Sequence, residues 1–257
     1  MCGIVAYYGP DQAYDFLIKG LQRLEYRGYD SAGIALLGED LKVYKNKGKV
    51  SELEAISKGQ NLSGNRGIGH TRWATHGEPN TVNSHPHLSQ SGDIALIHNG
   101  IIENYDTLKK MLIARGHEFK SDTDTEVLTH LIEEIKNKEQ VDLLEAVRLA
   151  LNEVIGAYAI VILSKNDPNT LIAARKGSPL VVGISDTPGE FYLASDASPI
   201  VEYTKTVTYL NDNEIVSIHN GEMTLKTIDN VAISPYIQKL KISLDAIEKG
   251  GYEHFML

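Results

Sequence analysis

Cysteine is almost absent from this sequence of 257 residues, which contains a single one, Cys2. A lone thiol cannot close an intramolecular disulfide, and a metal site built from thiolates needs several, so neither can stabilise the chain. Secreted chains of this kind usually carry paired cysteines, so the composition predicts a cytoplasmic location.

Positive charge and long apolar runs are also scarce. Lysine and arginine number 25 against 34 aspartates and glutamates, which gives a formal net charge of -9. Without a basic cluster to neutralise phosphates, nonspecific nucleic-acid binding lacks its main driving force. No apolar run is long enough to cross a bilayer, and the N-terminus lacks the regions of a secretory signal. We therefore expect neither nucleic acid nor a membrane as a partner.

The remaining composition is ordinary for a folded protein. Hydrophobic residues make up 42% and charged residues 23%, which argues against extensive disorder. The chain is long enough to bury a substantial core, and one large α+β domain is as plausible as two small ones.

The pattern of the first half predicts short strands and one helix. Residues 3–9 read as a buried strand, and apolar residues then recur at helical spacing from Ala13 to Leu24. Residues 31–37 and 41–47 predict a hairpin. Strand-like segments at 68–71 and 93–99 are separated by a long loop rich in histidine, asparagine and proline, and such loops are usually functional or disordered.

The second half predicts a helical block followed by a block of strands. The Asn-Gly pair at 220–221 is a strong hairpin signal, and strand blocks on both sides of a helical block favour α+β with largely antiparallel sheets. The pattern fades after residue 228, so we assign 2–228 to the folded domain and 229–257 to its end and the start of a linker. Helices are predicted at 105–115, 125–136 and 141–154, and strands at 157–163, 171–175, 180–184, 191–194, 207–210 and 214–219.

The position of Cys2 favours reactivity. If Met1 is removed, Cys2 carries both a thiol and a free α-amine, and the amine can serve as the general base for its own thiol. The alternative is that Cys2 is a small buried apolar residue, since free cysteine is often buried.

Four polar segments lie at the ends of predicted strands or the starts of helices, where sites are commonly found. Their residue types suit thiolate attack on an amide. Asn99 offers a side-chain N–H, and Gly100 a backbone N–H, to a developing oxyanion. The guanidinium of Arg72 suits a substrate carboxylate, and the carboxylate of Asp124 suits a substrate ammonium. The segments are residues 25–33, 70–77, 98–104 and 121–126.

These segments make the chain similar to a known family. Tyr-Arg-Gly-Tyr-Asp-Ser-Ala-Gly at 26–33 and Thr-Arg-Trp-Ala-Thr-His-Gly at 71–77, together with Cys2 and the closing segment 248–256, resemble the glutaminase domain of glutamine:fructose-6-phosphate aminotransferases. Other class II glutamine amidotransferases, such as the phosphoribosylpyrophosphate type, share the leading cysteine but do not resemble the chain in these two motifs.

The resemblance implies a four-layer αββα fold of the N-terminal-nucleophile hydrolase type and a glutaminase reaction through a γ-glutamyl thioester, without a cofactor. It also implies an isomerase domain of the same protein as the partner that uses the ammonia, and a homodimer of the full-length protein. The residue roles that it implies are nucleophile and base for Cys2; the oxyanion hole for Asn99 and Gly100; glutamine binding for Arg72, Trp73, Thr75, His76, Gly100 and Asp124; and support of the nucleophile for Arg27.

Some of these roles have alternatives. Without its motif, Arg72 would be read as a solvent-exposed charge on the surface and not as a substrate ligand. A residue at position 124 or 123 could cap the following helix, so Asp124 or Thr123 is a candidate N-cap. Trp73 could pack in the core. The loop histidines could suggest a metal, although His-Pro-His at 85–87 is not a recognised ligand spacing. For the whole chain, the rivals are a glutaminase serving another acceptor and a catalytically silent domain of the same fold.

Overall fold

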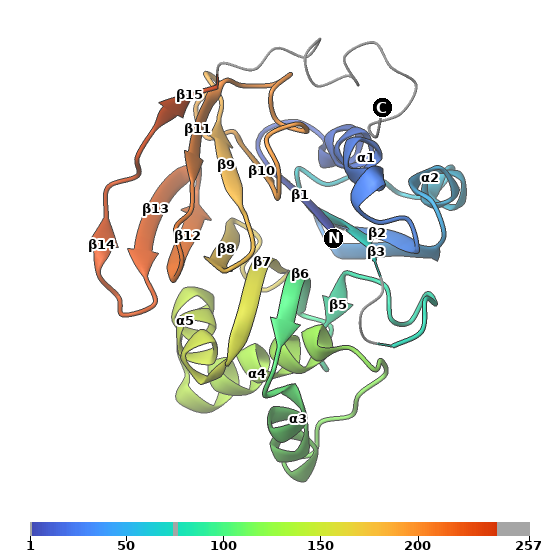
Figure 1. Ribbon diagram of the computed structural model, residues 1–257, viewed down its shortest axis with the longest axis vertical. Coiled ribbons are helices and arrows are strands. Elements are labelled where there is room, and N and C mark those ends of the chain that lie inside the picture. The colour runs from blue at the N-terminus through green and yellow to red at the C-terminus, as the bar shows by residue number, and fades with distance from the viewer. Residues whose placement is uncertain (1, 74–76, 241–257) are drawn as a thin grey trace.

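Two antiparallel β-sheets lie face to face, and helices cover the outer face of each (Figure 1). The structure, a computed structural model, describes residues 2–73 and 77–240. The four layers follow the order αββα, so the α+β prediction with antiparallel sheets is confirmed.

The first sheet places the N-terminal strand β1 near its centre. β1 pairs with β10, which lies far along the chain, on one side and with β4 on the other. The strands in spatial order are β15 (Gln238–Lys239), β11 (Thr206–Tyr209), β9 (Val181–Ile184), β10 (Phe191–Ala194), β1 (Gly3–Tyr8), β4 (Arg66–Arg72), β2 (Ser31–Leu37) and β3 (Leu41–Lys47).

The longest strands of the second sheet are the antiparallel neighbours β6 and β7, which are separated in sequence by the three helices that cover this sheet. Its strands in spatial order are β14 (Ala232–Ile233), β13 (Glu222–Thr227), β12 (Glu214–His219), β8 (Thr170–Lys176), β7 (Gly156–Ser164), β6 (Ile94–Ile102) and β5 (His87–Leu88).

The helices divide between the two sheets. Those on the first sheet are α1 (Ala13–Leu24), α2 (Val50–Ser57) and the short 3-10 turn η1 (Glu25–Arg27). Those on the second sheet are α3 (Tyr105–Ala114), α4 (Asp124–Glu139) and α5 (Leu143–Glu153).

Alternation along the strands explains the layers. Ile4, Ala6 and Tyr8 of β1 belong to the core between the sheets, whereas Val5 and Tyr7 pack on the outer face with α1. Successive side chains of a strand point to opposite faces of the sheet, and both faces of β1 are covered by apolar layers. The sequence of β1 is therefore a continuous apolar run and does not alternate between apolar and polar residues.

Two differences from the sequence-based prediction have simple causes. α2 was not predicted, and it buries only Val50, Leu53 and Ser57, too few positions to establish a helical period. β14 and β15 lie in the segment where the strand pattern fades, and each has two residues, which is too short for a visible alternation. They pair with β13 and β11, so residues up to 240 contribute to both sheets.

None of the helices in the described residues has the length and apolar character needed to cross a membrane.

Candidate active site

The two sheets bring the predicted site residues together at one end of the fold. Cys2 precedes β1, and the register that pairs Gly3 with Thr71 places Cys2 beside Arg72 at the end of β4. Asn99 and Gly100 lie on β6 of the other sheet, and Asn99 Nδ2 donates to the carbonyl oxygen of Cys2 at 3.1 Å. This contact joins the facing sheets at the thiol.

The thiol of Cys2 is partly buried and lies against the backbone of Trp73. The N–H of Trp73 donates to Sγ at 3.3 Å, and Sγ lies 3.6 Å from the carbonyl oxygen of Trp73. Burial raises the pKa of the Cys2 thiol, against the lowering effects of the Trp73 backbone and the Arg72 charge. Within residues 2–73 and 77–240, no histidine or carboxylate hydrogen-bonds to Sγ. The structure therefore offers no side-chain base in direct contact with the thiol in that part of the chain.

Gly100 can only be glycine. Its φ is +136°, and a Cβ at this position would collide with the carbonyl oxygen of Ala157 on β7. The missing side chain leaves the backbone beside Cys2 open to the cavities described below.

Arg72 is 4% exposed, which excludes the solvated-charge alternative. Its guanidinium donates to the carbonyl oxygens of Glu78 and Gly77, both at 3.3 Å. Burial lowers the pKa of Arg72, but an arginine keeps its charge in proteins. A buried positive charge thus lies beside the thiol.

The N-cap of α4 is Thr123, whose Oγ1 accepts from the N–H of Glu126 at 3.3 Å, so the alternative in which Asp124 caps the helix is wrong. Asp124 is the first helical residue. Its Oδ2 accepts from the N–H of Ile102 at 2.8 Å, directly after the Asn99 and Gly100 segment. The carboxylate of Asp124 is therefore fixed to β6 and lies on the same side of the fold as Cys2.

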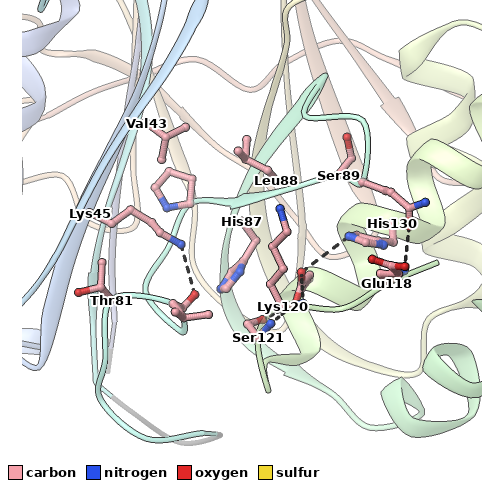
Figure 2. Close-up of a pocket in the computed structure, with 14 residues that line it drawn as sticks. Val43, Lys45, Thr81, His87, Leu88, Ser89, Glu118, Lys120, Ser121 and His130 are labelled. Carbon is pink, nitrogen blue, oxygen red and sulfur yellow. Dashed lines mark hydrogen bonds and ion pairs between the residues drawn. The ribbon is translucent and has the colours of Figure 1, made fainter. Parts of the chain in front are cut away.

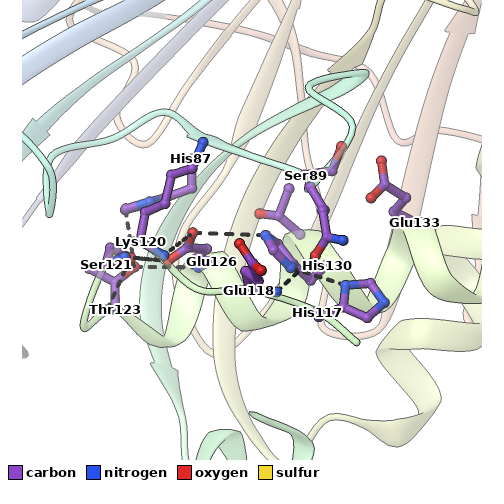
Figure 3. A network of polar contacts seen from close by, with 12 residues as sticks. His87, Ser89, His117, Glu118, Lys120, Ser121, Thr123, Glu126, His130 and Glu133 are labelled. Carbon is purple, nitrogen blue, oxygen red and sulfur yellow. Dashed lines mark hydrogen bonds and ion pairs between the residues drawn. The ribbon is translucent and has the colours of Figure 1, made fainter. Parts of the chain in front are cut away.

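A polar network fixes the segment that leads into α4 (Figure 3). The carboxylate of Glu126 accepts from the N–H groups of Lys120 and Ser121, at 2.9 and 2.6 Å. His87 on β5 lies 3.1 Å from Thr123 Oγ1. These contacts fix the segment immediately before α4, and so they help to hold Asp124, the first residue of the helix, in place.

Trp73 and Arg27 lie at the mouth of the site. Trp73 is 46% exposed and contacts the ring of Tyr29 edge-on at 5.7 Å, so it does not pack in the core. Arg27 pairs with Asp196 at 2.7 Å. Both side chains line a cavity that also includes Cys2.

Two cavities share Cys2, Trp73 and Gly100. The narrower one has about 30 Å³ and also contacts Arg72 and Asp124, and the wider one has about 310 Å³. Six further residues line these cavities and were not predicted as site residues from the sequence. They are His85, His98 and Thr125 in the narrow cavity and Ile101, Ser178 and Pro179 in the wide one. Thr75 and His76, predicted to bind substrate, lie outside the described residues.

A larger cavity of about 570 Å³ opens elsewhere, between β3, β5 and α4 (Figure 2). Lys45, His87 and Lys120 are among its lining residues, and Lys45 Nζ donates to the carbonyl oxygen of Ser84 at 2.8 Å. It contains none of the predicted site residues that the structure describes. Size alone therefore does not locate the chemistry.

The loop histidines make no metal cluster in the described part of the chain, where no group of three His, Cys, Asp or Glu side chains is arranged to hold an ion. His85 Nε2 and His98 Nδ1 both contact Thr125 Oγ1, at 2.9 and 3.0 Å. Burial lowers the pKa values of His85 and His98, so these rings are neutral structural partners of α4.

Comparison with known proteins agrees with this geometry. A family model described as a glutamine amidotransferase domain matches residues 55–244. The glutamine–fructose-6-phosphate aminotransferase (isomerizing) of Bacteroides thetaiotaomicron is 61% identical over 260 residues, and that of Chlorobaculum tepidum is 54% identical over 261. Each alignment covers 100% of this chain, which spans only 42% of each relative's length.

A solved structure supports the same assignment. The glutamine phosphoribosylpyrophosphate amidotransferase from B. subtilis superposes with a TM-score of 0.76 and 28% identity, over 88% of this chain and 49% of that one. The predicted N-terminal-nucleophile αββα fold is thus confirmed. A family match across most of the chain, a shared fold and a thiol at the junction of two cavities lead to one conclusion: the chain belongs to the glutamine amidotransferase domain family.

Proposed function

We propose that the chain hydrolyses the side-chain amide of L-glutamine to glutamate and ammonia, with Cys2 as nucleophile. The observation that carries the proposal is the position of Cys2, which lines two cavities together with Gly100 and whose backbone oxygen accepts from Asn99 Nδ2. A thiol, two N–H donors and a shielded cavity are the parts that acyl transfer requires.

The reaction begins with loss of a proton from a thiol whose pKa is raised by burial. After removal of Met1, the α-amine of Cys2 takes this proton, and Sγ attacks the amide carbon. Asn99 Nδ2 and the N–H of Gly100 stabilise the oxyanion. The intermediate collapses to a γ-glutamyl thioester as the protonated α-amine returns its proton to the leaving ammonia. Water then attacks the thioester, releases glutamate and restores the thiol. No step needs a cofactor.

The glutamine head group binds between opposite charges. Arg72 receives the α-carboxylate and Asp124 the α-ammonium, with Thr75 and His76 as further ligands and Trp73 over the mouth. Arg27 supports the wall near Cys2. The burial of Arg72 and Asp124, 4% and 6% exposed, supports this arrangement because charge pairing is stronger away from water.

Replacing Asn99 by alanine is expected to lower kcat for glutamine hydrolysis by roughly 10²- to 10³-fold, the loss typical of one oxyanion donor. The measurement is release of glutamate and ammonia under saturating glutamine. Asn104→Ala is the matched control, since Asn104 hydrogen-bonds to the backbone of Glu153 and Ile155 and lines neither cavity. An unchanged rate in Asn99→Ala would remove Asn99 from the oxyanion hole.

Asp124→Asn is expected to lower kcat/KM for glutamine by about 10- to 100-fold, because a hydrogen bond to a charged partner contributes about 1.5–3 kcal/mol. Asparagine keeps an oxygen that can accept from the N–H of Ile102, so the fold is preserved. The control substrate is glutaramate, which lacks the α-amine and cannot pair with Asp124. Equal losses for both substrates would contradict the ammonium assignment.

We further propose that the ammonia serves conversion of fructose 6-phosphate to glucosamine 6-phosphate by an isomerase domain of the same protein, which is a homodimer when full length. The names of the relatives, and the 42% of their length that this chain spans, support the separate isomerase domain, whereas the homodimer rests on the family resemblance alone. Exposed Tyr26, Tyr29, Trp73 and Ile101 near the wide cavity offer apolar surface for that domain.

We assign the glutaminase domain to residues 2–228, and the end of the domain and the start of the linker to residues 229–257. We also propose a cytoplasmic location, because the chain has a single cysteine.

The acceptor is tested by restoring the native C-terminal continuation of the chain and assaying glucosamine 6-phosphate. Formation of a phosphoribosylamine in its place would favour the phosphoribosylpyrophosphate type, which the 28% identity to that structure keeps as the second candidate.

A further inference from the structure

His70 on β4 contacts the same amide that faces the thiol. Its side chain is 1% exposed, and Nε2 lies 2.9 Å from Asn99 Oδ1 and 3.0 Å from the carbonyl oxygen of His98. Both neighbours of Nε2 are oxygens that only accept hydrogen bonds. Nε2 therefore carries the proton and donates to both.

The opposite ring nitrogen agrees with this tautomer. Nδ1 of His70 is buried and has no hydrogen-bond partner among the described residues, so a proton there would be unsatisfied. Burial lowers the pKa of His70 to about 3, so the ring is neutral near neutral pH. The ring of His85, 4.0 Å away between centroids, packs against it. His70 thus presents one fixed N–H to Asn99.

The orientation of the Asn99 amide follows from that N–H. With Oδ1 directed to His70, Nδ2 is directed to Cys2, where it donates to the backbone oxygen at 3.1 Å. A flipped amide would place N–H against the N–H of His70 and would turn a carbonyl oxygen toward the reacting centre. An oxygen there would repel an oxyanion instead of stabilising it.

We propose that His70 is a positioning residue that fixes the Asn99 amide so that its N–H faces the oxyanion of the glutaminase reaction. The proposal rests on the proposed function. His70 lines neither cavity, and the proposal assigns its effect on the rate to Asn99 and not to its packing against His85.

A double-mutant cycle with Asn99→Ala tests the proposal. His70→Leu should lower kcat by about 10- to 100-fold and leave KM for glutamine within about twofold, since one oxyanion donor is misoriented. In the Asn99→Ala background the same replacement should have almost no further effect. His70→Gln, which keeps an N–H donor, should recover most of the rate. An undiminished effect of His70→Leu in the Asn99→Ala background would overturn the proposal.

The control and a second readout separate positioning from folding. His130 is equally buried but contacts His117 and lies outside both Cys2 cavities, so His130→Leu should change stability without a comparable loss of kcat. In the unmodified protein, long-range ¹H–¹⁵N spectra should show His70 protonated at Nε2 only, across roughly pH 6 to 8. A proton on Nδ1 would overturn the proposal even if His70→Leu fails to fold. If Asn99→Ala alone keeps full activity, the oxyanion assignment fails instead.

Discussion

Cys2→Ala is expected to reduce glutamine hydrolysis by at least roughly 10⁴-fold, because no other group can form the thioester and loss of a nucleophile removes the covalent route entirely. The fold should survive. Cys2 is partly buried, and its thiol hydrogen-bonds only to the backbone of Trp73 among the described residues, so no buried polar side chain loses its partner. The expected shift in unfolding free energy is about 1 kcal/mol or less.

The measurement is glutamate release, with the unfolding midpoint recorded for the same samples. Cys2→Ser is the informative companion, because it replaces the thiol with a hydroxyl of similar size that is a much weaker nucleophile. An electrophilic glutamine analogue should label the unmodified protein at Cys2, as seen by mass spectrometry, and should leave Cys2→Ala unlabelled. Glutaminase activity that persists in Cys2→Ala would refute the nucleophile assignment.

The local elements that carry the thiol follow directly from the sequence. The apolar run at β1, the α1 stripe from Ala13 to Leu24 and the β2–β3 hairpin have strong periods and clear turns, and the structure confirms all three. The strand that carries Asn99 and Gly100 is predicted less accurately. The prediction ends this strand at residue 99, whereas β6 extends to Ile102, because pairing with β7 continues through Gly100 despite its positive φ.

The long-range arrangement could not be predicted in the same way. The pairing of β1 with β10 joins residues nearly two hundred positions apart, and no local pattern specifies it. Likewise, Ser178 and Pro179 reach the wide cavity only because β8 and β9 belong to different sheets. The link between His70 and Asn99 also joins the two sheets, so the sequence alone suggested only a cluster of loop histidines.

Blocking the α-amine is expected to be the second large effect. A protein that keeps an N-terminal extension should hydrolyse glutamine roughly 10²- to 10⁴-fold more slowly than the same protein after cleavage directly before Cys2, the usual contribution of a general base. The reason lies in the thiol's surroundings. Burial raises its pKa, and no histidine or carboxylate of the described residues hydrogen-bonds to Sγ.

The pH dependence distinguishes a missing base from a blocked cavity. The neutral amine is the active form, so kcat/KM of the cleaved protein should rise with pH and level off above the α-amine pKa of about 7.7–8.0. An extension that merely obstructs the cavity should raise KM and leave this profile in place, whereas loss of the base should lower kcat and remove the rise. The shortest extension, Met1 alone, is the sharpest variant, because it converts the amine to an amide with the least added bulk. Full activity with Met1 retained would mean that another group takes the proton from Cys2.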